Sequence, residues 1–321
     1  MKFGVLNFLE HPMGGKTEHR VIQEQLETLR AAEDLGFDYL WAPEHHFTEY
    51  GFCASPMLML AAMASITKRI RLASGVVVLP FNDPIRIAEE AAVVDLMSNG
   101  RLELGVGRGF HPTEFRGFGV EQAHATDIFD EALQIIKLAW TREKVAFKGK
   151  HFNIEEHAVR PKPLQQPYPT IWLAAVSKPS FELAGASGYN LLFALIPGFH
   201  KAPTVECLHI YKRALCASGY SPDQKEIAAL CVVYCGETTE QARRDFGAPM
   251  LQSKALICGN PEYCINQIEK IAKEYGITQL VCWTRVSGLE HPKIIKSLEL
   301  FGNHVIPYFR SQNWSATDTT C

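Results

Sequence analysis

The chain has 321 residues, of which 47% are hydrophobic and 21% charged, and its 32 basic and 35 acidic residues give a formal net charge of −3. This balance is ordinary for a globular protein and argues against nucleic acid as a partner. There is no run of about 18 apolar residues, and the apolar start is too short for a signal peptide, so we expect a cytoplasmic protein without a membrane segment.

Short apolar runs rich in β-forming residues recur along the chain, at 2–7, 38–42, 71–79, 101–106, 170–175, 190–194, 227–234 and 279–283. Helical patterns lie between most of them, at 19–35, 85–97, 129–141, 180–186, 203–218, 239–246 and 261–275. Strands that alternate with helices and read as continuous apolar runs are typical of a parallel sheet that is covered on both faces.

An open, doubly wound sheet is the alternative to a closed barrel, and it would place a glycine fingerprint directly after the first strand. The glycine-rich segment 105–109 instead follows the fourth predicted strand and continues into a loop that is broken by Pro112. This favours an α/β fold of TIM type, a (β/α)8 barrel with insertions. We expect a single barrel domain over residues 1–310 and a disordered C-terminal tail over 311–321.

One further helical pattern, at 56–66, is apolar nearly all the way round, whereas the outer helix of a barrel should have one wet face. We expect its second face to be buried against another subunit, with residues 85–96 completing the surface. The sequence therefore predicts a homodimer.

The nine cysteines contain no C-x-x-C pair, and Cys231 and Cys282 lie within apolar runs. Free cysteine commonly behaves as a small buried hydrophobe. We expect reduced core thiols in preference to disulfides or a metal site.

The second predicted strand runs directly into three ionisable residues, Glu44, His45 and His46. Barrel enzymes load their active sites with side chains from the C-terminal ends of the strands. The segment after residue 42 is therefore a candidate catalytic loop.

Several segments between residue 1 and about 310 together carry a resemblance to one family. They are 1–4, 36–48, 78–90, 95–101, 105–109, 115–119 and 288–307. In these segments the chain resembles the bacterial luciferase-like flavin monooxygenases. The resemblance implies an FMN-dependent enzyme that receives reduced FMN (FMNH2) from a separate flavin reductase. It would add dioxygen to form a flavin peroxide and oxygenate an apolar small-molecule substrate, such as an aldehyde, a ketone or a natural product.

Two alternatives remain within this resemblance. One is a deazaflavin-dependent oxidoreductase, which needs no dioxygen. The other is a non-catalytic flavin-binding partner subunit, which has no need for a titratable group in the loop after residue 42.

The resemblance also implies roles for residues of the candidate loop. His45 matches the histidine that the catalytic subunit of luciferase uses for acid–base work, which an imidazole can perform near neutral pH. Glu44 either orients His45 or hydrogen-bonds loop amides. For His46 a structural place within the loop is the favoured interpretation.

The cofactor-binding residues are implied in the same way. Arg108 matches an arginine that contacts the flavin phosphate, and Ser177 and Ser180 match residues that bind the same phosphate, although either serine could simply cap the helix that follows. Gly75 and Val76 fall where luciferase has a non-prolyl cis peptide beneath the flavin.

At three positions the chain departs from the luciferase pattern. Gly107 stands in place of a reactive cysteine, Val176 in place of an acidic residue, and Thr126 in place of a second phosphate-binding arginine. Losing that arginine should weaken phosphate binding by roughly 1 to 3 kcal/mol unless His124 or Lys178 compensates. The segments 198–202 and 247–258 are expected to be mobile loops over the substrate.

Overall fold

The computed structural model describes residues 1–10, 16–48, 51–196, 204–246, 256–285 and 288–312. The chain divides into two compact units. Unit 1 comprises Met1–Trp41 and Trp172–Cys321, and unit 2 comprises Ala42–Ile171.

Unit 1 is built on parallel strands. They are β1 (Lys2–Leu6), β2 (Tyr39–Ala42), β8 (Thr170–Ala174), β9 (Asn190–Ala194), β10 (Ile227–Cys235), β11 (Leu256–Gly259) and β12 (Gln279–Trp283), with the ends of β2 and β8 reaching into unit 2. They pair in the order β8, β9, β10, β12, β1, β2, and β11 adds to β10. Because β1 and β12 are parallel neighbours, their C-terminal ends lie side by side.

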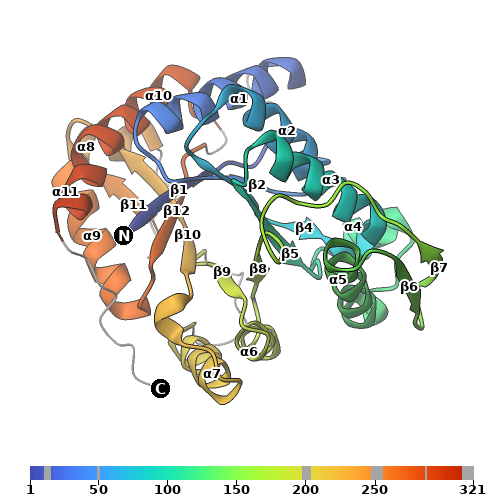
Figure 1. Cartoon of the computed structure of the whole chain (residues 1–321). Coiled ribbons are helices and arrows are strands. Elements are labelled where there is room, and N and C mark those ends of the chain that lie inside the picture. Colours follow the sequence, from blue (N-terminus) through green and yellow to red (C-terminus); the bar gives the residue numbers. More distant parts are fainter. Residues whose placement is uncertain (11–15, 49–50, 197–203, 247–255, 286–287, 313–321) are drawn as a thin grey trace. The chain divides into compact units, whose positions relative to one another are not determined.

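The helices of unit 1 lie on the outer side of these strands (Figure 1). They are α1 (Glu18–Asp34), α6 (Lys178–Ala186), α7 (Thr204–Ala217), α8 (Thr239–Phe246), α9 (Pro261–Tyr275), α10 (His291–Leu300) and α11 (Ile306–Ser311), with a 3-10 turn at Pro222–Gln224 and a π-helical turn at Phe301–Val305. The ring of Phe3 on β1 packs 5.5 Å from the rings of both Phe301 and Phe309, which joins the first strand to the last helices.

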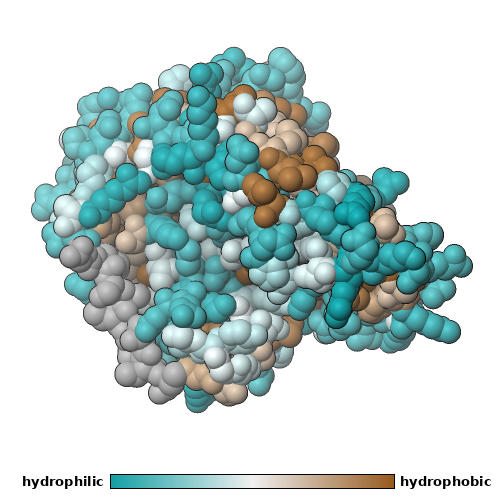
Figure 2. Space-filling view, in the orientation of Figure 1, coloured by the Kyte–Doolittle hydropathy of each residue, from teal (hydrophilic) through white to brown (hydrophobic). Residues whose placement is uncertain are grey.

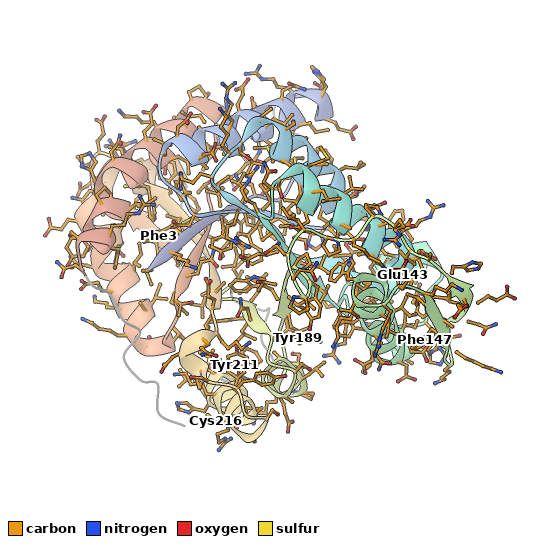
Figure 3. The ribbon with its side chains drawn as sticks, in the orientation of Figure 1. Phe3, Glu143, Phe147, Tyr189, Tyr211 and Cys216 are labelled. Carbon is orange, nitrogen blue, oxygen red and sulfur yellow. The ribbon has the colours of Figure 1, made fainter. Side chains whose placement is uncertain are left out.

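Helices α6 and α7 approach each other closely at Gly185. A Cβ atom on Gly185 would lie 2.4 Å from the carbonyl oxygen of Tyr211 on α7, so only glycine fits there. The hydroxyl of Tyr211 donates to the carbonyl oxygen of Tyr189 at 2.8 Å, and both residues lie in the region of α6 and α7 in Figure 3. This contact fixes the chain just before β9.

Unit 2 carries the remaining elements. They are α2 (Pro56–Ile66), β3 (Arg71–Ser74), β4 (Val77–Val78), a 3-10 turn (Leu79–Phe81), α3 (Pro84–Met97), β5 (Leu102–Gly107), α4 (Pro112–Phe118), a second 3-10 turn (Gln122–His124), α5 (Ala125–Thr141) and the antiparallel hairpin β6 (Val145–Lys148) and β7 (Asn153–His157). Strands β3 and β4 both pair in parallel with β5.

The predicted TIM-type barrel is confirmed. A closed parallel barrel is formed by β1, β2, β3, β5, β8, β9, β10 and β12, which are the strands expected from the sequence. The expected strand at 71–79 is interrupted after Ser74, and the chain resumes pairing at Val77. Pro112, which we expected to break a loop, instead begins helix α4, because proline is well suited to the first turn of a helix. The single domain over 1–310 stays a prediction.

Two other expectations need correction, and further ones concern residues that the structure does not describe. Residues 256–258 belong to strand β11 and not to a loop, because they pair with β10. Residue 311 ends helix α11, so the expected tail does not start there. The expected loops at 198–202 and 247–255 and the rest of the tail, 313–321, lie outside the described residues.

Seven cysteines are free and buried, as expected, namely Cys53, Cys207, Cys231, Cys235, Cys258, Cys264 and Cys282. Burial raises the pKa of the Cys231 thiol to about 12, so this thiol is protonated and unreactive at neutral pH. Cys216 is disulfide-bonded, so the expectation of reduced thiols is wrong at this position.

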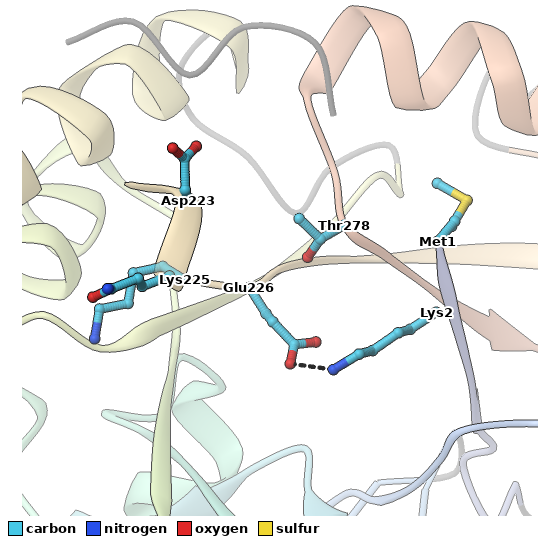
Figure 4. Close-up of a pocket in the computed structure, with 7 residues that line it drawn as sticks. Met1, Lys2, Asp223, Lys225, Glu226 and Thr278 are labelled. Atoms are coloured by element: carbon cyan, nitrogen blue, oxygen red, sulfur yellow. Dashed lines mark hydrogen bonds and ion pairs between the residues drawn. The ribbon is translucent and has the colours of Figure 1, made fainter. Parts of the chain in front are cut away.

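A cavity of about 370 Å³ opens at the N-terminal end of the strands of unit 1 (Figure 4). It is lined by Met1, Lys2, Asp223, Gln224, Lys225, Glu226 and Thr278. Lys2 and Glu226 pair across it at 2.6 Å. The N-terminal end of a barrel generally serves stability and the C-terminal end carries the active site, so we expect the active site at the other end of the strands. Within the described residues no helix has the length and apolar character needed to span a membrane.

Candidate active site

Glu44 follows β2 and is buried, and its two carboxylate oxygens bind β4 and the residue after the 3-10 turn that follows β4. Oε2 accepts a hydrogen bond from the backbone N–H of Val78 at 2.8 Å, and Oε1 accepts one from Nδ2 of Asn82 at 2.9 Å. Of the two roles considered for Glu44, hydrogen bonding to loop amides is therefore observed. It ties the candidate loop to β4.

The peptide bond between Gly75 and Val76 is cis, as the resemblance implied. It lies between β3 and β4. The backbone N–H of Gly75 donates to the carbonyl oxygen of Ala42 at 2.7 Å, and the hydroxyl of Ser74 both donates to the carbonyl oxygen of Gly105 and accepts from its N–H. The end of β2 and the middle of β5 thus both hold this segment in place.

His45 is paired with Glu114, a residue that the sequence analysis did not single out. Nδ1 of His45 lies 2.9 Å from Oε1 of Glu114, whose side chain is almost fully buried. Burial by itself would raise the pKa of Glu114, but the hydrogen bonds from His45 and from the backbone N–H of His46 outweigh it, so the pKa lies below its usual value.

The protonation of this pair follows from that shift. Glu114 is ionised at neutral pH and can only accept hydrogen bonds, so Nδ1 of His45 carries the proton that is shared with it. Nε2 is then the nitrogen that can take up or release a proton. A carboxylate that fixes the tautomer and orientation of a histidine is a common arrangement for acid–base catalysis.

His46 is held on three sides. Its backbone N–H donates to Oε1 of Glu114 at 3.0 Å, its Nε2 lies 3.1 Å from Oε1 of Glu44, and its ring packs edge-on against Phe118 at 4.6 Å. These contacts agree with the structural place that we expected for it. Glu44 therefore orients His46, and Glu114 orients His45.

Glu114 was missed because we expected a loop beyond residue 109. It lies in the first turn of α4, and its carboxylate is within hydrogen-bond distance of the His45 ring and of the backbone N–H of His46. A signal was present in the sequence, since proline followed closely by an acidic residue is typical of a helix start.

Three phenylalanine side chains of unit 2 remain exposed around the histidine pair. Phe47 is 61% exposed, Phe110 44% and Phe118 40%. The ring of Phe110 lies 6.4 Å from that of His45, and the ring of Phe47 lies 5.4 Å from that of Phe118. Exposed aromatic groups next to a titratable pair suit a ligand with a large apolar part.

Arg108 follows β5 and is partly exposed. Its Nη1 donates to the hydroxyl of Thr126 at the start of α5, at 3.1 Å. Its charge also acts on Asp130, whose pKa is raised by burial despite the opposing effect of the arginine. Arg108 and Thr126, which stands where luciferase has the second arginine, therefore lie together.

The three remaining candidates, Val176, Ser177 and Ser180, belong to unit 1. The hydroxyl of Ser180 accepts from the backbone N–H groups of Val176 and Ser177 at 3.1 and 3.0 Å and donates to the carbonyl oxygen of Ser177 at 2.7 Å. Ser180 thus caps the start of α6, which is one of the two roles considered for the serines. Nζ of Lys178 lies 2.5 Å from Oε1 of Glu206, so its charge is already partly balanced.

One set of candidates lies within unit 2, namely Glu44, His45, Gly75, Val76 and Arg108. Glu44 is bonded to Val78 of β4, and Val78 pairs with Gly107, the residue before Arg108. The other set, Val176, Ser177 and Ser180, lies together in unit 1. His124, which we considered as a replacement for the missing arginine, is in unit 2, where its ring lies 5.4 Å from that of His151.

A closed parallel barrel with a histidine in the loop after β2, paired with a carboxylate of α4, has the architecture of a barrel enzyme. Residues 1–257 match the model of the family described as luciferase-like monooxygenases. The chain belongs to this family.

Two curated relatives illustrate the match. The oxygenase component of the flavin-dependent trigonelline monooxygenase of Acinetobacter baylyi is 31% identical over 245 residues, which are 76% of this chain and 67% of the relative. An uncharacterized protein of Sinorhizobium fredii is 39% identical over 171 residues, and the chain spans only about half of it (49%).

Among solved structures, the monooxygenase RslO1 of Streptomyces bottropensis is similar with a TM-score of 0.88 and 26% identity, covering 96% of this chain and 100% of that one. Its similarity extends over nearly the whole chain and supports the fold described above.

Proposed function

We propose that this protein is a cytoplasmic monooxygenase that uses FMNH2 and dioxygen to oxygenate a small molecule with a large apolar part. The pair of His45 and the buried Glu114 carries the proposal, since it places an oriented imidazole in the loop after β2. A non-catalytic partner subunit would have no use for such a pair. The trigonelline relative is named as an oxygenase component, which supports a separate flavin reductase as partner.

The residues of the chain have distinct parts in this proposal. His45 exchanges a proton through Nε2 with the reacting groups, and Glu114 keeps the ring in the required tautomer. Glu44 positions β4 and the cis peptide, and Phe110 helps to keep water from the ring of His45. Bound FMNH2 would supply the electrons that activate dioxygen.

The donor set in unit 2 fits a flavin phosphate. The guanidinium of Arg108 offers charged donors to a dianion, and the hydroxyl of Thr126 lies within hydrogen-bond distance of it. In the proposal these two residues hold the phosphate from unit 2.

Replacing Thr126 tests the phosphate site. Thr126→Arg restores the second cation of the luciferase pattern, so we expect FMN to bind about 10-fold to 100-fold more tightly. Isothermal titration calorimetry measures the affinity. Thr113→Arg, which adds the same charge to α4 beside Arg116, is the matched control and should leave the affinity nearly unchanged. Equal gains from both variants would point to a general charge effect and not to this site.

Oxygen consumption tests the function itself. The protein is mixed anaerobically with chemically reduced FMN, a panel of aldehydes, ketones and aromatic compounds is added, and isotopically labelled dioxygen is admitted. We expect an oxygenated product whose new oxygen atom derives from labelled dioxygen. A reduced deazaflavin replaces FMN in a parallel arm. Substrate reduction in that arm without dioxygen uptake would favour the deazaflavin-dependent alternative and contradict the proposal.

We also propose that the protein is a homodimer through helices α2 and α3. Apolar side chains gather over these helices in Figure 2. The exposed ones are Leu58, Ile66, Val93, Leu96 and Met97, and Leu58 is 74% exposed. A contiguous apolar surface of this kind is typical of a protein interface, and a second copy of the chain offers the matching surface.

The dimer prediction concerns the most exposed of these residues. Leu58→Glu places a charge in the apolar surface, so we expect it to shift the protein from dimer to monomer at micromolar concentration in analytical ultracentrifugation. Val205→Glu alters an exposed apolar side chain on α7 of unit 1 and should leave the dimer intact. A monomeric wild-type protein would contradict the proposal.

A further inference from the structure

At the C-terminal ends of β1 and β12, the side chain of Asn7 is oriented by its surroundings. Its Oδ1 accepts hydrogen bonds from the backbone N–H groups of Thr284 and Arg285, both at 2.9 Å, and from the hydroxyl of Thr284 at 3.1 Å. Because both backbone groups are obligatory donors, the oxygen must be the atom that faces them, and Nδ2 must point away.

Nδ2 of Asn7 is left without an acceptor in the described part of the chain, although the residue is only 1% exposed. A buried amide that lacks its hydrogen bonds is costly, and such groups are rare in folded proteins. Asn7 therefore carries two N–H donors that are available to a partner that the chain itself does not provide.

Arg285, the neighbour of this amide, shows the same feature. Its Nη2 donates to Oε2 of Glu24 at 2.9 Å, but its Nη1 has no acceptor among the described residues, and the residue is 7% exposed. The guanidinium is always charged, so an unpaired edge is more costly there than in a neutral group. The two unpaired donor groups come from residues that are joined by the hydrogen bond between Asn7 Oδ1 and the N–H of Arg285.

The charges around Arg285 favour an anion. Glu24 on α1 accepts hydrogen bonds from Lys16 and Arg20 in addition to Arg285. One carboxylate is thus paired with three cationic side chains, so these four side chains together have a net positive charge. Glu24 also fixes one edge of the guanidinium, which leaves the other edge in a defined position for a ligand.

An aromatic pair completes this corner of unit 1. The ring of Trp283, at the end of β12, packs edge-on against that of Phe8 at 4.9 Å, and its indole N–H donates to the carbonyl oxygen of Arg285. A cation, an amide and aromatic rings at the C-terminal ends of barrel strands are groups from which ligand sites are commonly built.

We propose that Asn7 and Arg285 bind a carboxylate group of the organic substrate. Arg285 would donate from Nη1 and Asn7 from Nδ2, so that both unpaired donor groups gain an anionic acceptor. The assignment rests on the proposed function, because it names the class of substrate: a small organic acid whose remaining part is aromatic or apolar. A carbonyl oxygen of the flavin itself is the competing source of an acceptor.

Binding of matched acids and amides to the flavin-free protein tests this assignment without any turnover. The probes are benzoate, phenylacetate and acetate, each compared by calorimetry with its neutral amide of nearly the same shape. We expect at least one acid to bind ten or more times more tightly than its amide. If no acid is preferred by the wild-type protein, the assignment is wrong, whether or not the protein oxidises reduced FMN.

Two variants locate the preference. Asn7→Asp keeps Oδ1, which holds Thr284 and Arg285, but replaces the donor Nδ2 by an oxygen that would repel a carboxylate. Arg285→Gln removes the cation while Lys16 and Arg20 still balance Glu24. We expect each variant to lose the preference for the acid. Thermal unfolding of each variant checks that it is folded.

Matched controls make the result specific. Asn190→Asp alters another buried asparagine whose Oδ1 holds a backbone N–H, and Arg310→Gln removes an exposed guanidinium of the same unit. Both should keep the preference for the acid. Persistence of the preference in Asn7→Asp or Arg285→Gln, or equal loss in the controls, would overturn the assignment. A loss of FMN affinity in the two site variants, with no acid preference in the wild type, would assign the acceptor to the flavin.

Discussion

His45→Ala is expected to lower turnover by about 100-fold to 10,000-fold while FMN still binds with unchanged affinity. The range is what a positioned general acid or base typically contributes. The imidazole is lost, but Glu44 still holds β4, and Arg108 and Thr126 still lie together. The measurements are the rate of product formation at saturating FMNH2 and a calorimetric titration with FMN.

Two further variants make this result interpretable. His46→Ala removes the neighbouring imidazole, which we consider structural, and should change turnover less than 10-fold in the folded protein. Glu114→Gln keeps an oxygen that can accept from the N–H of His46 but removes the charge that orients His45, so we expect kcat to fall about 10-fold with little change in KM. Full turnover in His45→Ala would rule out acid–base catalysis by this residue.

Glu24→Gln is expected to destabilise the protein by about 3 kcal/mol at pH 7. Burial tends to raise the pKa of Glu24, but hydrogen bonds from Lys16, Arg285 and Arg20 outweigh it and bring the pKa to about 2, against an ordinary value of 4.5. A difference of about 2.5 units corresponds to roughly 3 kcal/mol. The neutral amide also leaves Arg285 without a charged partner in a buried place.

The pH dependence has a definite sign. The pKa of Glu24 is lower in the folded state than in the unfolded state, so its contribution is complete above about pH 4.5 and is lost as the pH falls toward 2. Urea unfolding of wild type and Glu24→Gln should therefore differ most at pH 7 and converge near pH 2. Glu143→Gln, which breaks the exposed pair with Arg160, should cost less than about 1 kcal/mol at any pH. A difference that persists unchanged at pH 2 would contradict the assignment.

The barrel could be predicted because its signals are local. Each of its strands is a short apolar run, and the helices between them have apolar residues at helical spacing. The exceptions arise where pairing with a distant strand decides the outcome. β11 pairs with the end of β10 although its sequence resembled a loop, and β3 stops at Ser74, where hydrogen bonds to Gly105 and Ala42 fix the chain.

The candidate site was predicted in part for a similar reason. His45 could be found because it follows a strand directly, and the cis bond at Gly75 and Val76 followed from the family resemblance. The partner of His45 could not be found in this way. Glu114 lies 69 residues further along the chain, and nothing in the local sequence indicates which histidine it contacts.

The sequence by itself determined the class of fold, the family and the residue types in the loop after β2, since these depend on local pattern and on resemblance. The tertiary structure alone decided which carboxylate bonds to which histidine. It also decided that Nδ2 of Asn7 and Nη1 of Arg285 have no acceptor among the described residues. The physical reason is that hydrogen bonding between side chains is set by distances and directions in three dimensions. Residues far apart in the chain meet only when the strands that carry them have paired.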